Sequence, residues 1–288
     1  MYENIYGLSC VENQILYHLK LLDMDISMLY SDSLIAFDDL YNSFVINEES
    51  PDYFNKIPKI QNTLQSLGVL QYSYYKKDDI SEVLLNLKNV NDFLLFRVKS
   101  DFAKNTLYAR GFRPDHYVCA KRLDKNIEII NDIPYKKILI SQEELYSIYD
   151  GSYIVFTIIR YLNEYDREIL SKNIINIPQN ANYISENCVP IKQTNDLNLR
   201  IRNLLRILKI LRYRVYEYYR NYIDVGFIKE MCILINKYFA TCEYFNLRNV
   251  VDNKKYIELL NKVIEADNKI ISGLKERSQM LRDHNKNK

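Results

Sequence analysis

Cys10 stands where a helix is expected to begin, a position that can make a thiol reactive. The apolar residues that follow are spaced as on one face of a helix and predict a helix over 10–22: Val11, Ile15, Leu16, Leu19 and Leu22. Ser9 is a suitable N-cap, which would leave Cys10 as the first helical residue. Because the positive end of a helix dipole stabilises a thiolate, Cys10 is a candidate nucleophile. The alternative is an ordinary buried cysteine.

His116 and Asp132 could complete a catalytic set with that thiol. His116 is the first residue of a predicted strand, and a base at the start of a strand can face a thiol at the N-terminus of a helix. Asp132 ends the next strand, so its carboxylate can reach the imidazole, fix its tautomer and stabilise the imidazolium. Asn131 is the alternative orienting residue. The competing interpretations are a hydrogen-bonded strand histidine and a plain Asn-Asp turn before Pro134.

Composition narrows the class of protein. The 288 residues include 39 Lys and Arg against 37 Asp and Glu, a net charge of +2 that gives no general attraction to nucleic acid or membranes. The five cysteines form no CxxC pair and only three histidines are present, which argues against a disulfide framework and a zinc cluster. We see no signal peptide, and apolar runs such as Tyr153–Ile159 are too short to cross a bilayer. We therefore expect a cytoplasmic protein.

The periodicity along the chain indicates an α+β body followed by helices. The expected helices are 10–22, 32–46, 56–67, 80–87, 141–149, 196–222, 226–246 and 252–283. The expected strands are 91–98, 116–121, 126–131 and 153–159, the second and third forming a hairpin. Gly68 is expected to end a helix, and Ser141 with Glu144 forms a capping box. The predicted organisation is a body at 1–160, a connecting segment at 161–195 and a helical C-terminal part at 196–288.

The order of these motifs is similar to that of papain-like cysteine proteases. The motifs are a Cys at the start of the first long helix, then His-Tyr-Val-Cys-Ala opening a strand at 116–120, and Ile-Ile-Asn-Asp-Ile-Pro at 129–134. Over roughly residues 4–160, including a following helix and Asp150-Gly151, the chain resembles bacteriocin-leader peptidases and, more narrowly, butirosin-type acyltransferases. This implies a papain-like fold, an N-terminal helix packed on an antiparallel sheet, with a helical C-terminal extension.

The resemblance also implies roles for individual residues. Cys10 would be the nucleophile, His116 the general base and Asp132 its orienting acid. Peptidases of this type carry an oxyanion-hole Gln six residues before the Cys, and here that position is Asn4, one methylene shorter. Ser9 and Val11 also replace the residues usual beside the peptidase Cys. These departures point away from leader peptidase.

By the same resemblance, the expected reaction is acyl transfer with amide formation. Butirosin-type relatives take an acyl group from an acyl or peptidyl carrier protein and pass it to an amine, and one enzyme of this description joins carrier-bound acyl units to a diamine. The cofactor expectation is none, because phosphopantetheine arrives on the carrier protein. The partners would be that carrier protein and a small amine acceptor, with no nucleic acid and no membrane. The alternatives are a leader-type cysteine peptidase and a non-catalytic scaffold that binds a carrier protein.

A basic stretch offers a candidate surface for an acidic carrier protein. Residues 196–222 hold seven basic and two acidic side chains, and charge complementarity of this kind raises association rates. We expect Arg206, Lys209 and Arg212 to form the docking surface. The alternative is that these residues are only the solvated face of a helix whose apolar stripe includes Leu204, Leu208 and Leu211. Nucleic-acid binding by the stretch is disfavoured by the near-zero net charge.

Overall fold

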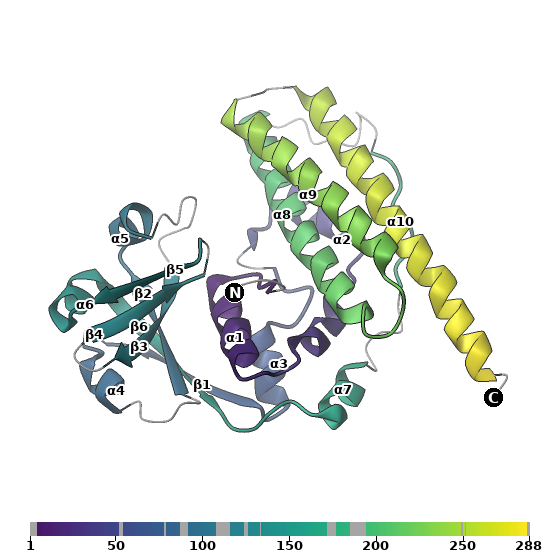
Figure 1. Ribbon diagram of the computed structural model, residues 1–288. Helices are drawn as coiled ribbons and strands as arrows, with labels where there is room; N and C mark the ends of the chain where they lie inside the picture. Colours follow the sequence, from purple (N-terminus) through teal and green to yellow (C-terminus); the bar gives the residue numbers. More distant parts are fainter. Residues whose placement is uncertain are drawn as a thin grey trace. The chain divides into compact units, whose positions relative to one another are not determined.

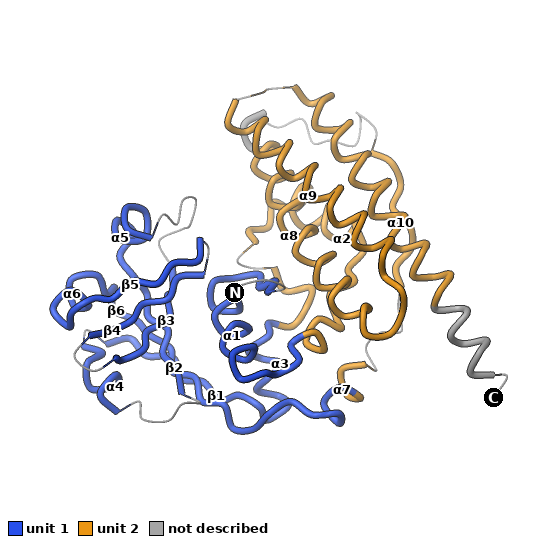
Figure 2. The backbone as a smooth tube through the Cα atoms, viewed as in Figure 1, with its two compact units in different colours: residues 1–26, 59–167 blue, residues 27–58, 168–288 orange. Residues whose placement is uncertain are grey.

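The computed structural model describes residues 5–51, 54–77, 79–86, 92–107, 116–123, 126–132, 134–171, 177–184, 194–248, 250 and 252–286, without the side chains of 194–196 and 278–286. The chain divides into two compact units (Figure 2). Unit 1 consists of residues 1–26 and 59–167, and unit 2 of residues 27–58 and 168–288. The segment 27–58 therefore groups with the C-terminal helices, whereas the sequence-based boundaries assign it to the N-terminal body.

Unit 1 is built on a six-stranded antiparallel sheet in the order β1-β6-β2-β3-β4-β5 (Figure 1). Its strands are β1 (Leu70–Lys76), β2 (Asp92–Val98), β3 (His116–Leu123), β4 (Asn126–Asn131), β5 (Lys136–Ile140) and β6 (Tyr149–Ile158). Its helices are α1 (Cys10–Leu21), α3 (Ile60–Ser66), α4 (Ser81–Asn86), α5 (Ser100–Asn105), α6 (Gln142–Ile148) and the first part of α7 (Glu164–Ser171). Mixed helices and an antiparallel sheet confirm the predicted α+β class.

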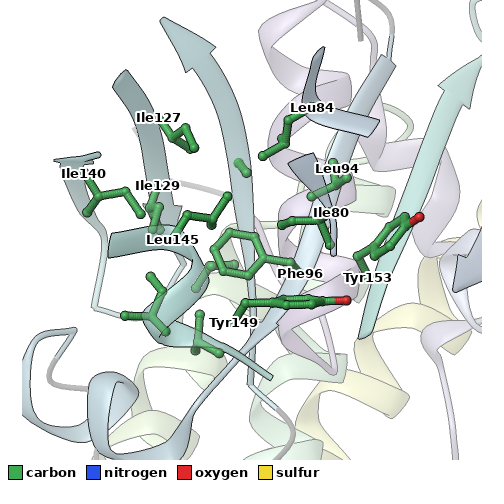
Figure 3. Close-up of a cluster of buried hydrophobic side chains, with 14 of the residues drawn as sticks. Ile80, Leu84, Leu94, Phe96, Ile127, Ile129, Ile140, Leu145, Tyr149 and Tyr153 are labelled. Atoms are coloured by element: carbon green, nitrogen blue, oxygen red, sulfur yellow. The ribbon is translucent and has the colours of Figure 1, made fainter. Parts of the chain in front are cut away.

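The two faces of the sheet are covered differently, because side chains alternate along each strand. One face packs with α4 and α6 around a buried apolar cluster that includes Phe96, Ile127, Ile129 and Leu145 (Figure 3). The other face packs against α1, where the rings of His18 and Phe93 stack with centroids 4.1 Å apart. The register of β3 with β2 and β4 assigns each strand residue to one of these faces.

Unit 2 is helical. Its elements are η1 (Ile26–Ser33), a 3-10 helix that starts at the unit boundary, α2 (Phe37–Tyr41), the π-helical turn η2 (Asn42–Ile46), the end of α7, α8 (Thr194–Tyr219), α9 (Gly226–Leu247) and α10 (Asn253–Lys286). The helix α9 packs against α8 and α10, and η2 and α2 pack against α8. The predicted apolar stripe of α8 is buried, with Leu204, Leu208 and Leu211 fully inaccessible. Among the described helices, none has the length and apolar character needed to span a membrane.

Local signals located many elements correctly. The hairpin of β3 and β4, the capping box of α6 and the left-handed Gly68 (φ 69°) are all confirmed. The predicted helix 32–46 is instead divided among η1, α2 and η2. The strands β1 and β5 and the helix α5 were not predicted, and α7 lies in part of the expected connecting segment.

Candidate active site

The N-terminus of α1 has the cap predicted for it. Ser9 has extended backbone geometry (φ −137°, ψ 165°), its Oγ accepts a hydrogen bond from the Glu12 amide at 3.2 Å, and Cys10 is the first residue of the helix. The buried Glu12 carboxylate accepts two further backbone hydrogen bonds, from Leu8 at 2.8 Å and from Ile60 at 3.1 Å. These contacts hold the start of α1 against the preceding chain and α3.

The surroundings of Cys10 do not favour the thiolate that its helical position predicts. Burial raises the pKa of the Cys10 thiol to about 12, and the negative charge of Asp132 acts in the same direction. Hydrogen bonds from the backbone at Tyr117, Val11 and Cys10 itself lower the pKa and offset only part of this rise. Desolvation therefore outweighs the helix dipole, and the resting thiol is protonated. The Tyr117 contact locates the thiol beside β3, one residue from His116.

His116 is oriented by an amide. Its Nε2 lies 2.6 Å from Oδ1 of Asn131, and Nδ2 of Asn131 donates to the carbonyl oxygen of Pro134, also at 2.6 Å. The His116 and Asn131 side chains are 1% and 0% exposed. Since the NH₂ end of the amide is held by Pro134, its oxygen must face the imidazole, so neutral His116 carries its proton on Nε2. The lone pair is then on Nδ1.

Asp132 does not occupy the position predicted for it. The structure assigns the orienting contact at Nε2 to Asn131, the alternative considered above, while Oδ2 of Asp132 accepts a hydrogen bond from Nδ2 of Asn13 at 3.0 Å. The physical reason is alternation along β4: Asn131 shares a face with Ile127 and Ile129, and Asp132 follows on the side of α1. Asp132 therefore acts on Cys10 rather than at the Nε2 position.

Three further residues of the site were missed in the sequence. The amide of Gly7 donates to Oδ1 of Asn13 at 2.7 Å, and Nε2 of Gln14 donates to the carbonyl oxygen of Ile130 at 2.8 Å. Asn13 and Gln14 lie three and four residues after Cys10, so they share its face of α1. Two buried amides on the helix face that carries the thiol are the signal that could have identified them.

Other predicted residues are not part of this cluster. Asn4, predicted for the oxyanion hole, lies outside the described residues. No three His, Cys, Asp or Glu side chains come together as a metal site in the described parts of the chain. The site therefore consists of a thiol, an imidazole, a carboxylate and amides.

The prediction that Arg212 belongs to a docking surface on α8 is wrong. Its side chain is 0% exposed, forms a salt bridge with Asp267 of α10, with Nη2 and Oδ2 2.8 Å apart, and donates from Nη2 to the carbonyl oxygen of Ile35 at 2.7 Å. Lys209 is half-buried, with Nζ 4.3 Å from the centroid of the Phe239 ring, and burial lowers its pKa. Of the three residues, Arg206 is exposed. The basic residues of α8 therefore largely face neighbouring helices instead of solvent.

No protein-family model matches this sequence, and no curated protein matches it significantly. The chemistry of the site thus has to follow from its own residues and their contacts.

Proposed function

We propose that this protein is a papain-like cysteine acyltransferase that moves an acyl group from a carrier-protein thioester, through an acyl-Cys10 intermediate, onto a small amine. The observation that carries the proposal is the location of the Cys10 thiol at the N-terminus of α1 and against the backbone of Tyr117, the residue after His116, whose imidazole is oriented by Asn131. A nucleophile, a base and an orienting group are the components of this chemistry.

The residues would act in two balanced steps. In the first, Nδ1 of His116 takes the thiol proton as Cys10 sulfur attacks the thioester carbonyl. The pantetheine sulfur leaves and takes that proton. In the second, the amine attacks acyl-Cys10, His116 accepts the amine proton, and the sulfur of Cys10 leaves and is reprotonated. Because both steps exchange or consume a thioester, neither requires ATP. Since the resting thiol is protonated, proton transfer has to accompany the attack. Backbone N–H groups at the start of α1 can stabilise the oxyanion.

The proposed chemistry requires the Cys10 thiol and the His116 imidazole to meet, although they belong to different faces of the sheet. Alternation along β3 assigns His116 to the face of Val118 and Ala120, and Tyr117 to the face of α1. The thiol and the imidazole must therefore meet around the end of β3. His116 and Tyr117 precede Cys119 and Ile130, the first described pair of β3 with β4.

Burial of the site favours transfer to an amine over hydrolysis. His116 is almost inaccessible and Cys10 is half-buried, and exclusion of water protects a reactive acyl intermediate. A leader-type cysteine peptidase, the alternative, needs water at the same carbon. The non-catalytic scaffold is favoured by a different observation, the raised pKa of Cys10, because an unactivated thiol needs no base.

Two measurements test the proposal. 1,3-Dibromoacetone alkylates a thiol and an imidazole with one three-carbon bridge, so peptide mass spectrometry should find Cys10 joined to His116. An acyl thioester of N-acetylcysteamine should then acylate Cys10, and added amines should release amide in preference to acid. Cys119→Ala is the matched control, since it removes a buried thiol of the same unit. Absence of both the bridge and acyl-Cys10 would refute the mechanism, and release mainly as acid would favour the peptidase.

A further inference from the structure

Asn13 uses both ends of its side-chain amide to connect two parts of unit 1. Its Oδ1 accepts the Gly7 N–H at 2.7 Å, and its Nδ2 donates to Oδ2 of Asp132 at 3.0 Å. Asn13 and Asp132 are 5% and 2% exposed, so this contact is made away from water. An amide–carboxylate hydrogen bond is charge-assisted, and in a buried setting its loss leaves polar groups without solvent to replace it.

A second contact runs parallel to the first. Nε2 of Gln14 donates to the backbone carbonyl of Ile130 at 2.8 Å. The N-terminal part of α1 is therefore attached to residues 130 and 132, on either side of Asn131, which holds His116. One three-residue stretch at the end of β4 thus contacts both the helix that carries the thiol and the side chain that orients the imidazole.

We infer that Asn13 and Asp132 are positioning residues, whose hydrogen bond fixes the start of α1 relative to the end of β4 and so sets Cys10 against His116. This inference rests on the proposed function for its catalytic meaning. The negative charge of Asp132 opposes ionisation of the neighbouring thiol, so this carboxylate does not activate Cys10. Its contribution is geometric, and it acts through Asn13.

Exchanging the two side chains tests this assignment. Asn13→Asp alone sets two carboxylates against each other, which should lower the melting temperature and reduce the Cys10–His116 bridging yield roughly tenfold, within the range of couplings between residues in contact. In the double variant Asn13→Asp/Asp132→Asn, the carboxylate now on α1 can accept from both the Gly7 N–H and the amide now on β4. The bridging yield should recover to within about threefold of the wild-type value. The melting temperature should return to near that of the wild type.

Asn62→Asp is the matched control, because it makes the same charge change at an exposed position of the same unit. A double variant no better than Asn13→Asp would overturn the inference. If Asn13→Asp does not fold, Gln14→Ala, which removes the parallel contact to Ile130, should lower the bridging yield of folded protein. An unchanged bridging yield in Gln14→Ala, or a folded Asn13→Asp with the wild-type yield, would mean that these contacts only stabilise the fold. Either result would contradict the positioning role.

The two hypotheses fail in different ways. If wild-type protein forms neither the Cys10–His116 bridge nor acyl-Cys10, the proposed function fails. The recovery of the melting temperature in the double variant would still show whether Asn13 and Asp132 depend on each other. If the wild-type bridge forms and the exchange restores nothing, the positioning role fails while the catalytic pair stands.

Discussion

Nε2 of His116 lies 2.6 Å from Oδ1 of Asn131, and the opposite end of that amide is fixed by the carbonyl oxygen of Pro134. An amide held in this way can only accept at the imidazole. It therefore selects the neutral tautomer with its lone pair on Nδ1, which is the atom that the proposed chemistry requires as base.

The first prediction concerns this tautomer. Asn131→Ala removes the acceptor of a buried N–H and a donor to Pro134, so we expect the unfolding free energy to fall by about 1–3 kcal/mol. In wild-type protein, ¹⁵N NMR should show His116 protonated on Nε2, and the variant should show a mixture of tautomers. His18→Ala serves to assign the second imidazole of unit 1. Finding wild-type His116 protonated on Nδ1 would contradict the assignment of Asn131.

A second prediction follows from the raised pKa of Cys10. The folded pKa of about 12 lies above the value of about 8.5 for a free cysteine. The folded state therefore favours the protonated thiol; this stabilisation is complete below pH 8.5 and is lost as the pH rises toward 12. Iodoacetamide should modify Cys10 increasingly fast above pH 9, without a plateau at lower pH.

The control for the alkylation experiment is chosen from the charged and titratable groups near the Cys10 thiol. Asp132 at the end of β4 raises the pKa of Cys10, Glu12 lies on the first turn of α1 itself, and His116 opens β3. Asp132→Asn should shift the alkylation profile to lower pH, because it removes a negative charge beside the thiol. A profile that levels off below pH 8 in the wild type would mean an activated thiolate and would overturn this account.

Sequence patterns identified α1, the β3–β4 hairpin and α6 because each depends on local signals such as caps, turns and apolar spacing. The strand β1 was not predicted because its partner is β6, about eighty residues away in the sequence, where Leu70 pairs with Ile158. Local propensity cannot reveal such a pairing. The grouping of 27–58 with the C-terminal helices likewise depends on long-range contacts, as between η2 and α8.

The site shows the same limit at the scale of single residues. Cys10, His116 and the 131–132 pair were found from their types and their places at the ends of elements. Which of Asn131 and Asp132 faces the imidazole depends on strand register, because a shift of one residue exchanges the two faces. The contacts of Asn13 and Gln14 to the end of β4 join residues more than one hundred positions apart in the sequence. No local sequence pattern indicates which residues meet over such a separation.

The third prediction concerns Gly7, whose backbone approaches Asn13 closely. A Cβ added at Gly7 would lie 2.4 Å from Oδ1 and 2.5 Å from the backbone nitrogen of Asn13. Gly7→Ala should therefore displace the start of α1 and lower the unfolding free energy by about 1–3 kcal/mol in urea denaturation. The same substitution at Gly226 meets only an ordinary contact at 3.5 Å and should have little effect. Equal stability of the two variants would exclude this close approach.

The fourth prediction separates structure from docking on α8. Arg212→Met leaves the buried carboxylate of Asp267 without its cation, which should lower the unfolding free energy by about 3–5 kcal/mol. Arg206→Met makes the same substitution at an exposed position and should change stability by less than about 0.5 kcal/mol. In urea denaturation, the double variant Arg212→Met/Asp267→Leu should regain much of the loss, since an apolar pair of similar volume can replace a buried ion pair.

The proposed acyl transfer from a carrier protein can then be measured in a variant that remains folded. Only Arg206→Met is suited to that assay, since Arg212 supports the helices and Lys209 lies over the Phe239 ring. If α8 binds an acidic carrier protein through its exposed charge, Arg206→Met should slow transfer from the carrier more than transfer from a small thioester, and the difference should shrink at high salt. Equal slowing of both donors would exclude Arg206 as a docking residue.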